Sequence, residues 1–170
     1  MIRRQHVSRA LAGFVVAISL LNGHAQRPQA AGEWRYYSGD MGSTKYAPLD
    51  QISHTNVKDL RIAWRRPAVD DRVLALFPKR SITNYHRTTP LMAGGVVYAQ
   101  NGVGLVEALH PATGMVSWVQ EPRTGGLDGL NEGRASRGVA YWQEGEDRRI
   151  LTVRGNYLFA LDAKTGKASR

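Results

Sequence analysis

The strongest constraint on the fold of this chain is an internal repeat. Residues 108–118 and residues 160–170 align without a gap at a period of 52 residues. Both copies begin with Ala-Leu, carry Thr-Gly at the sixth and seventh positions and have Ser at the tenth. A period near 50 residues is typical of repeat architectures, and four short strands per unit predict a β-propeller blade.

Each copy has the composition of a strand, a tight turn and a returning strand. The apolar strand ends in Ala-Leu, polar residues follow, and Gly114 or Gly166 completes the turn, where a positive φ is expected. The returning strand of the first copy carries Trp118, whose ring can cover the edge between neighbouring blades. We interpret these three residues as turn and packing residues, with no catalytic role.

Short runs rich in β-branched and aromatic residues recur between Gly, Pro, Asn and Asp after residue 32, and no ten-residue stretch has helical periodicity. The sequence therefore predicts an all-β chain. Glycines at 94–95 and in the segment 101–104 predict hairpins that make a meander. The expected strands are 61–64, 89–92, 96–100, 105–109, 116–119, 139–142, 149–153 and 157–161.

These strands make about one full blade and parts of two more. We expect segment 61–64 to be a strand without a complete blade of its own, and the second repeat copy to end before its fourth strand. Propellers close with roughly four to eight blades. The prediction is a partial β-propeller, the first two to three blades of a larger one, which cannot close alone.

The amino terminus has the order of a secretory signal. Residues 1–9 hold three arginines and no acid, residues 10–21 carry no charge, and Gly23 and Ala25 are the small residues of a cleavage site. The uncharged run would make a helix of about 18 Å, short of the roughly 30 Å hydrocarbon core. We predict a cleaved signal peptide at 1–25, a linker at 26–32 and the propeller part at 33–170. An uncleaved anchor and a short amphipathic helix are the alternatives.

Composition excludes several classes of function. The net charge is +9, but Lys and Arg are scattered and are not interleaved with stacking aromatics, so we expect no nucleic-acid binding. The chain has no Cys, and its His residues lack a metal-ligand spacing. The acidic pairs at 70–71 and 144–147 lie beside arginines and are interpreted as solvated loops.

Several ordered motifs resemble the pyrroloquinoline-quinone (PQQ)-dependent, or quinoprotein, alcohol and glucose dehydrogenases. They are Glu-Trp at 33–34, Tyr-Ser-Gly-Asp at 37–40, Thr-Lys-Tyr-Ala-Pro-Leu-Asp-Gln-Ile at 44–52, Thr-Pro-Leu at 89–91, Arg-Gly-Val-Ala-Tyr-Trp at 137–142, and the two repeat copies. The resemblance implies an eight-bladed periplasmic propeller that holds PQQ and a Ca²⁺-type ion. Such enzymes oxidise an alcohol or sugar hydroxyl and pass electrons to a cytochrome or a membrane quinone.

Few functional residues transfer from the family to this chain. Arg137 matches the arginine that contacts the carboxylates of the cofactor, and its neighbours Ser136 and Gly138 could line the same pocket. A structural arginine at a blade terminus is the alternative for Arg137. The metal ligands and the general base are expected beyond residue 170, so we predict no catalytic or metal-binding residue here and no activity of this piece alone.

Two positions depart from the methanol-oxidising members of that family. Arg87 stands where they have a glutamate, three residues before the matching proline, and Asn131 and Glu132 stand where they have adjacent cysteines. Other branches lack those cysteines, so the departures indicate a branch of the family.

Two further interpretations remain open from the sequence. One is a non-catalytic propeller scaffold or binding protein of the cell envelope, which need not share the motifs at 33–52 and 137–142. The other is a lone module with exposed strand edges, which would be prone to aggregation.

Overall fold

The computed structural model describes residues 32–76, 82, 86–122, 137–154 and 157–169. The predicted signal segment, the linker up to residue 31, Asn131, Glu132 and Ser136 lie outside the described residues. No helix in the part described is long and apolar enough to cross a membrane. Strands dominate the described chain, which confirms the all-β prediction.

The first sheet is a four-stranded antiparallel meander in the order β1-β2-β3-β4. Gly94 and Gly95 join its first two strands with φ of +59° and +78°, as a type I′ hairpin turn requires. The bounds of β2 and β4 are those predicted, and β1 and β3 differ by one or two residues. The strands are β1 (Leu91–Ala93), β2 (Val96–Gln100), β3 (Val106–Leu109) and β4 (Val116–Val119).

The second sheet contains three antiparallel strands in the order β5-β6-β7. After β7 the chain turns back, and the N–H of Ser169 donates to the C=O of Ala160 at 2.8 Å. The fourth strand, which we expected to be absent from this copy, therefore begins as an isolated bridge between Leu161 and Ala168. The strands are β5 (Ala140–Glu144), β6 (Asp147–Arg154) and β7 (Tyr157–Asp162).

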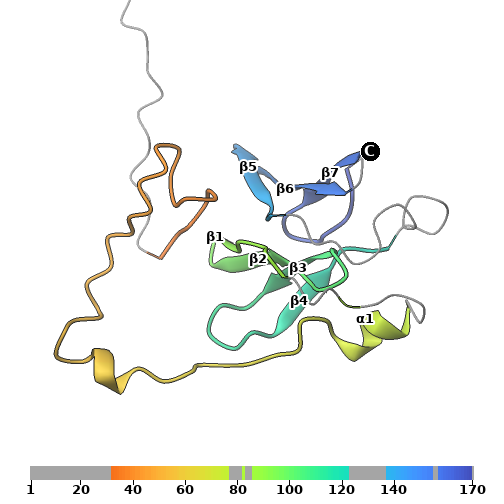
Figure 1. Cartoon of the computed structure of the whole chain (residues 1–170). Coiled ribbons are helices and arrows are strands. Elements are labelled where there is room, and N and C mark those ends of the chain that lie inside the picture. The colour runs from red at the N-terminus through yellow and green to blue at the C-terminus, as the bar shows by residue number, and fades with distance from the viewer. Residues whose placement is uncertain (1–31, 77–81, 83–85, 123–136, 155–156, 170) are drawn as a thin grey trace, which may run out of the picture.

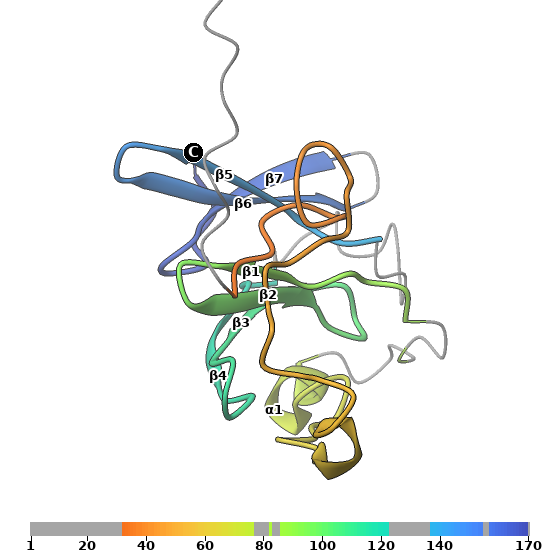
Figure 2. The same ribbon diagram turned by 90° about the vertical axis from the view of Figure 1, so that its left-hand side faces the viewer.

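The two sheets lie on each other as layers (Figures 1 and 2). Their facing sides form one apolar core, and hydrogen bonds from β2 cross it. Tyr98 of β2 donates its hydroxyl to the C=O of Ala163 at 3.2 Å, and Gln100 donates its amide to Thr152 of β6 at 2.7 Å. The buried residues of this core are Leu91, Ala93, Tyr98, Val106, Ala108, Val139, Ile150, Leu161 and Ala163.

Two tryptophans dock on the two repeat turns in the same way. Trp118 of β4 covers Gly166 and donates its indole N–H to the C=O of Ala163 at 3.1 Å. Trp64 covers Gly114 and donates to the C=O of Pro111 at 2.8 Å. The packing role predicted for Trp118 is confirmed, and each sheet is joined through a tryptophan to the segment before it.

The prediction of a strand at 61–64 is wrong. Residues 61–67 are extended but pair with no strand of the described chain, and residues 61–63 are exposed. The side chain of Trp64, and not a ladder of backbone hydrogen bonds, attaches this segment to the first sheet. Figure 1 shows the chain before it running around the outside of both sheets, with η1 (Val57–Asp59) as a single turn.

We predicted that the acidic pair at 70–71 lies in a loop, and this prediction is wrong. The pair starts a short helix. Asp70 is the N-cap of α1 (Asp71–Ala75), and its carboxylate accepts from the backbone N–H of Arg72 at 2.9 Å. An aspartate at this position satisfies one of the free N–H groups of the first turn. Val73 of α1 is buried with Val69, Val103 and Leu105 in a second, smaller core.

Candidate functional site

The first strands of the two sheets meet at one end, and Arg137 lies at this meeting point. Thr89, two residues before β1, forms a parallel bridge with Gly138, two residues before β5. The backbone N–H of Thr89 donates to the C=O of Arg137 at 3.0 Å. We call the group of residues 87–89 and 137–138 the seam. The bridge brings together a predicted site residue and a segment 48 positions earlier in the sequence.

The side chain of Arg137 is exposed. Its guanidinium forms no hydrogen bond or ion pair with any residue that the structure describes. A structural arginine at a blade terminus normally bonds to carbonyls or carboxylates around it, because its five N–H donors need acceptors. The guanidinium is therefore accessible to solvent or to a ligand.

Two further features lie in the seam. The sequence did not predict that the hydroxyl of Thr88 is buried without a hydrogen-bond partner among the described residues, which is rare in native structures. Arg87, which the family resemblance had already singled out, is exposed and adds a second positive charge two residues before Thr89.

An apolar pocket of about 350 Å³ adjoins the seam through Thr89. Its wall contains Pro90, Trp34 and three aliphatic side chains of β1 and β2, and it offers almost no polar surface. Its lining residues are Trp34, Thr89, Pro90, Leu91, Met92 and Val97.

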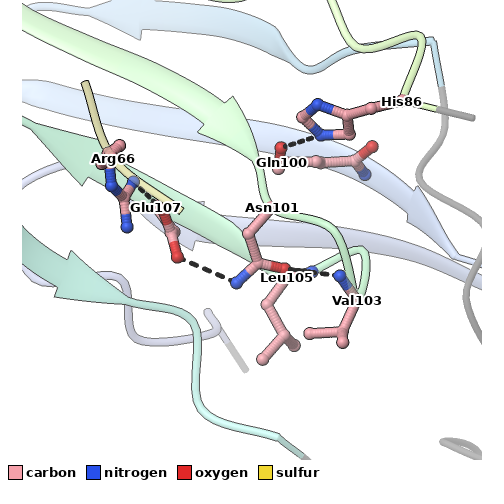
Figure 3. A network of polar contacts seen from close by, with 7 residues as sticks. All are labelled: Arg66, His86, Gln100, Asn101, Val103, Leu105 and Glu107. Atoms are coloured by element: carbon pink, nitrogen blue, oxygen red, sulfur yellow. Dashed lines mark hydrogen bonds and ion pairs between the residues drawn. The ribbon is translucent and has the colours of Figure 1, made fainter. Parts of the chain in front are cut away.

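A separate polar network lies under the first sheet and has a structural role (Figure 3). Arg66 forms an ion pair with the buried Glu107 of β3. Asn101 donates to the other carboxylate oxygen of Glu107 at 2.9 Å, and its own oxygen accepts from the backbone N–H groups of Val103 and Leu105 at 3.1 and 3.0 Å. Both carboxylate oxygens thus have partners, and Glu107 holds the segment after Trp64 against the sheet.

The described groups with shifted pKa values do not supply an acid or base for catalysis near neutral pH. Burial raises the pKa of Tyr98 to about 12, and burial also raises the pKa of Tyr141. Asp162 accepts a hydrogen bond from the Thr165 hydroxyl within the repeat turn. This bond lowers the pKa of Asp162, so its carboxylate stays ionised. No cluster of three His, Cys, Asp or Glu among the described residues could hold a metal ion.

Comparison with known proteins identifies the family. A family model described as "Glucose/ethanol/alcohol dehydrogenase, beta-propeller domain", of the PQQ type, matches residues 34–170. The dehydrogenase subunit of an alcohol dehydrogenase (quinone) from Gluconacetobacter polyoxogenes is 30% identical over 97% of this chain and 23% of the relative. A 1-butanol dehydrogenase (cytochrome c) from Thauera butanivorans is 29% identical over 96% of this chain and 21% of the relative.

Among solved structures, a europium-containing methanol dehydrogenase superimposes with a TM-score of 0.54 and 24% identity, over 81% of this chain and 22% of that structure. This likeness confirms the propeller fold. The chain spans between a fifth and a quarter of the length of these proteins. It belongs to the PQQ-dependent glucose, ethanol and alcohol dehydrogenase family, and it carries a part of the β-propeller of that family.

Proposed function

We propose that this chain is part of an exported PQQ-dependent alcohol dehydrogenase and that it contributes Arg137 to the binding of the cofactor. The observation that carries the proposal is the exposed guanidinium of Arg137, which has no partner among the described residues, at the seam between two blades of this family's propeller. The family match also favours an enzyme over a non-catalytic scaffold of the cell envelope.

The residues of the seam fit a flat, anionic ligand such as PQQ. A guanidinium binds a carboxylate through two parallel hydrogen bonds, and PQQ carries carboxylates on its ring system. Arg87 stands where the methanol-oxidising members have an acid, and its positive charge favours an anion at the seam. Gly138 completes the proposed lining among the described residues.

When bound, PQQ supplies the hydride acceptor for the oxidation of an alcohol or sugar hydroxyl. Arg137 would hold one carboxylate and thereby fix the orientation of the ring plane against the seam. The family resemblance assigns the general base and the ligands of the Ca²⁺-type ion to other parts of the protein. We therefore propose that this piece alone does not catalyse the reaction.

The relatives support an alcohol as substrate and point to the electron acceptor. Both relatives described above are named as alcohol or butanol dehydrogenases, one with quinone and one with cytochrome c in its name. We propose that electrons pass to a cytochrome or a membrane quinone. The signal-like sequence at 1–25 supports export to the periplasm, where cleavage after Ala25 is expected.

The test uses the longest reading frame that contains this chain. The purified apoprotein is titrated with PQQ in the presence of Ca²⁺, binding is followed by absorbance, and alcohol-dependent dye reduction is assayed. The variant Arg137→Ala should weaken PQQ binding at least tenfold, because one bidentate contact is lost. Arg137→Lys should restore only a part of the affinity, since an ammonium group keeps the charge but cannot form the planar fork.

Arg65→Ala is the matched control, because Arg65 is also an exposed arginine and lies outside the seam. It should leave both binding and dye reduction unchanged. Binding that is identical in wild type and Arg137→Ala would remove Arg137 from the cofactor site. A protein that binds no PQQ at all would favour the scaffold.

A further inference from the structure

The contact between the two sheets at the seam fixes the backbone of Arg137. Thr89 and Gly138 form a parallel bridge, and the C=O of Arg137 accepts from the N–H of Thr89 at 3.0 Å. Each partner lies two residues before the first strand of its sheet. The bond therefore sets where the Cα of Arg137 lies relative to β1.

This close approach depends on glycine at position 138. A Cβ placed on Gly138 would lie 2.9 Å from the carbonyl oxygen of Thr89, and its φ is +151°, a conformation that residues with side chains rarely adopt. The obstructing atom belongs to the backbone, so it can move only if the start of β1 moves with it. Any larger residue at this position would force the two sheets apart at the seam.

The side chain of Arg137 has no anchor of its own among the described residues. The position from which its guanidinium extends is therefore set by the backbone, through the bond to Thr89. Ligand-binding groups must be held within roughly 0.5 Å of their productive position. For Arg137, the support that the described residues supply is the hydrogen bond to its backbone.

We infer that the Thr89–Gly138 bridge is a positioning device for Arg137, with Gly138 and the N–H of Thr89 acting through that arginine on the carboxylate of the cofactor. The inference rests on the proposed function of Arg137. It assigns Gly138 a role in spacing the two blades, and it gives a role to Thr89, for which the motif at 89–91 supplied none.

A double-mutant cycle on the longest reading frame that contains this chain tests the inference. The dissociation constant for PQQ is measured for wild type, Gly138→Ala, Arg137→Ala and the double variant. Gly138→Ala should weaken binding at least tenfold in the wild-type background. It should cause no further weakening in the Arg137→Ala background, because the residue it positions is already gone.

Gly145→Ala is the matched control for backbone strain. Gly145 also has a positive φ, of +57°, but a Cβ there meets nothing within 4 Å. This variant should bind PQQ like wild type, and the melting temperatures of both apoproteins show how much of the effect is general destabilisation. A loss of affinity in Gly138→Ala that persists in full in the Arg137→Ala background would overturn the inference.

A second pair of variants covers the case in which Gly138→Ala does not fold. Thr89→Pro removes the N–H that donates to Arg137, whereas Thr89→Ala keeps it. Thr89→Pro should weaken PQQ binding at least tenfold more than Thr89→Ala does, because both variants lose the threonine side chain and only the proline loses the N–H donor. Equal affinities in the two variants contradict the positioning role. If the wild type and Arg137→Ala both fail to bind PQQ, the proposed function itself is wrong, and the positioning role falls with it.

Discussion

Trp118 docks on the turn of the second repeat copy. We therefore predict that the single methyl group added by Gly166→Ala lowers the free energy of unfolding strongly. Gly166 has a φ of +73°, and a Cβ at this position would lie 2.8 Å from Cδ2 of Trp118, well inside van der Waals contact. The ring is fixed on its other side by the hydrogen bond to the C=O of Ala163. It cannot move aside without losing that bond.

The expected cost of Gly166→Ala has two parts. A left-handed conformation costs a residue with a side chain about 1–2 kcal/mol. Overpacking against the indole adds about 1–3 kcal/mol. The free energy of unfolding should therefore fall by roughly 2–5 kcal/mol.

Gly145→Ala separates the two parts, because Gly145 shares the positive φ but has open space around its Cα. It should lose only the conformational part, about 1–2 kcal/mol. Urea unfolding of the full protein, followed by tryptophan fluorescence, measures both variants. If the two free energies of unfolding agree within about 0.5 kcal/mol, the indole does not restrict this turn, and the docking argument is wrong.

Two further predictions concern buried polar groups. The pKa of Tyr98 is raised to about 12 in the folded protein. The contribution of Tyr98 to stability is therefore present below its unfolded pKa near 10 and is lost as the pH rises towards 12. The urea midpoints at pH 8 and pH 11 should differ less in Tyr98→Phe than in wild type. Arg66→Ala leaves the carboxylate of Glu107, whose side chain is 3% exposed, without its ion-pair partner. Thermal or urea unfolding should show a loss of about 3–5 kcal/mol, and Arg65→Ala, the exposed neighbour, should stay within about 0.5 kcal/mol of wild type.

The repeat and the local turn chemistry determined most of the sheet structure from the sequence alone. Strands β2 and β4 have their predicted bounds, and the turn at Gly94 and Gly95 follows from the need for positive φ at two successive residues. These features depend on residues close together in the chain, and so a local pattern is sufficient to predict them.

Only the tertiary structure decided what happens where distant segments meet. Segment 61–64 has the composition of a strand, but it pairs with no strand in the part of the chain that the structure describes. Trp64 docks instead on a turn 50 residues later. The ion pair of Arg66 with Glu107 and the bond from Thr89 to Arg137 also join segments that are 41 and 48 residues apart. Residue type does not indicate which backbone N–H will donate to a distant carbonyl, because every residue except proline has the same donor. The seam that positions Arg137 therefore emerges from the packing of the two sheets, and not from any motif in either of them.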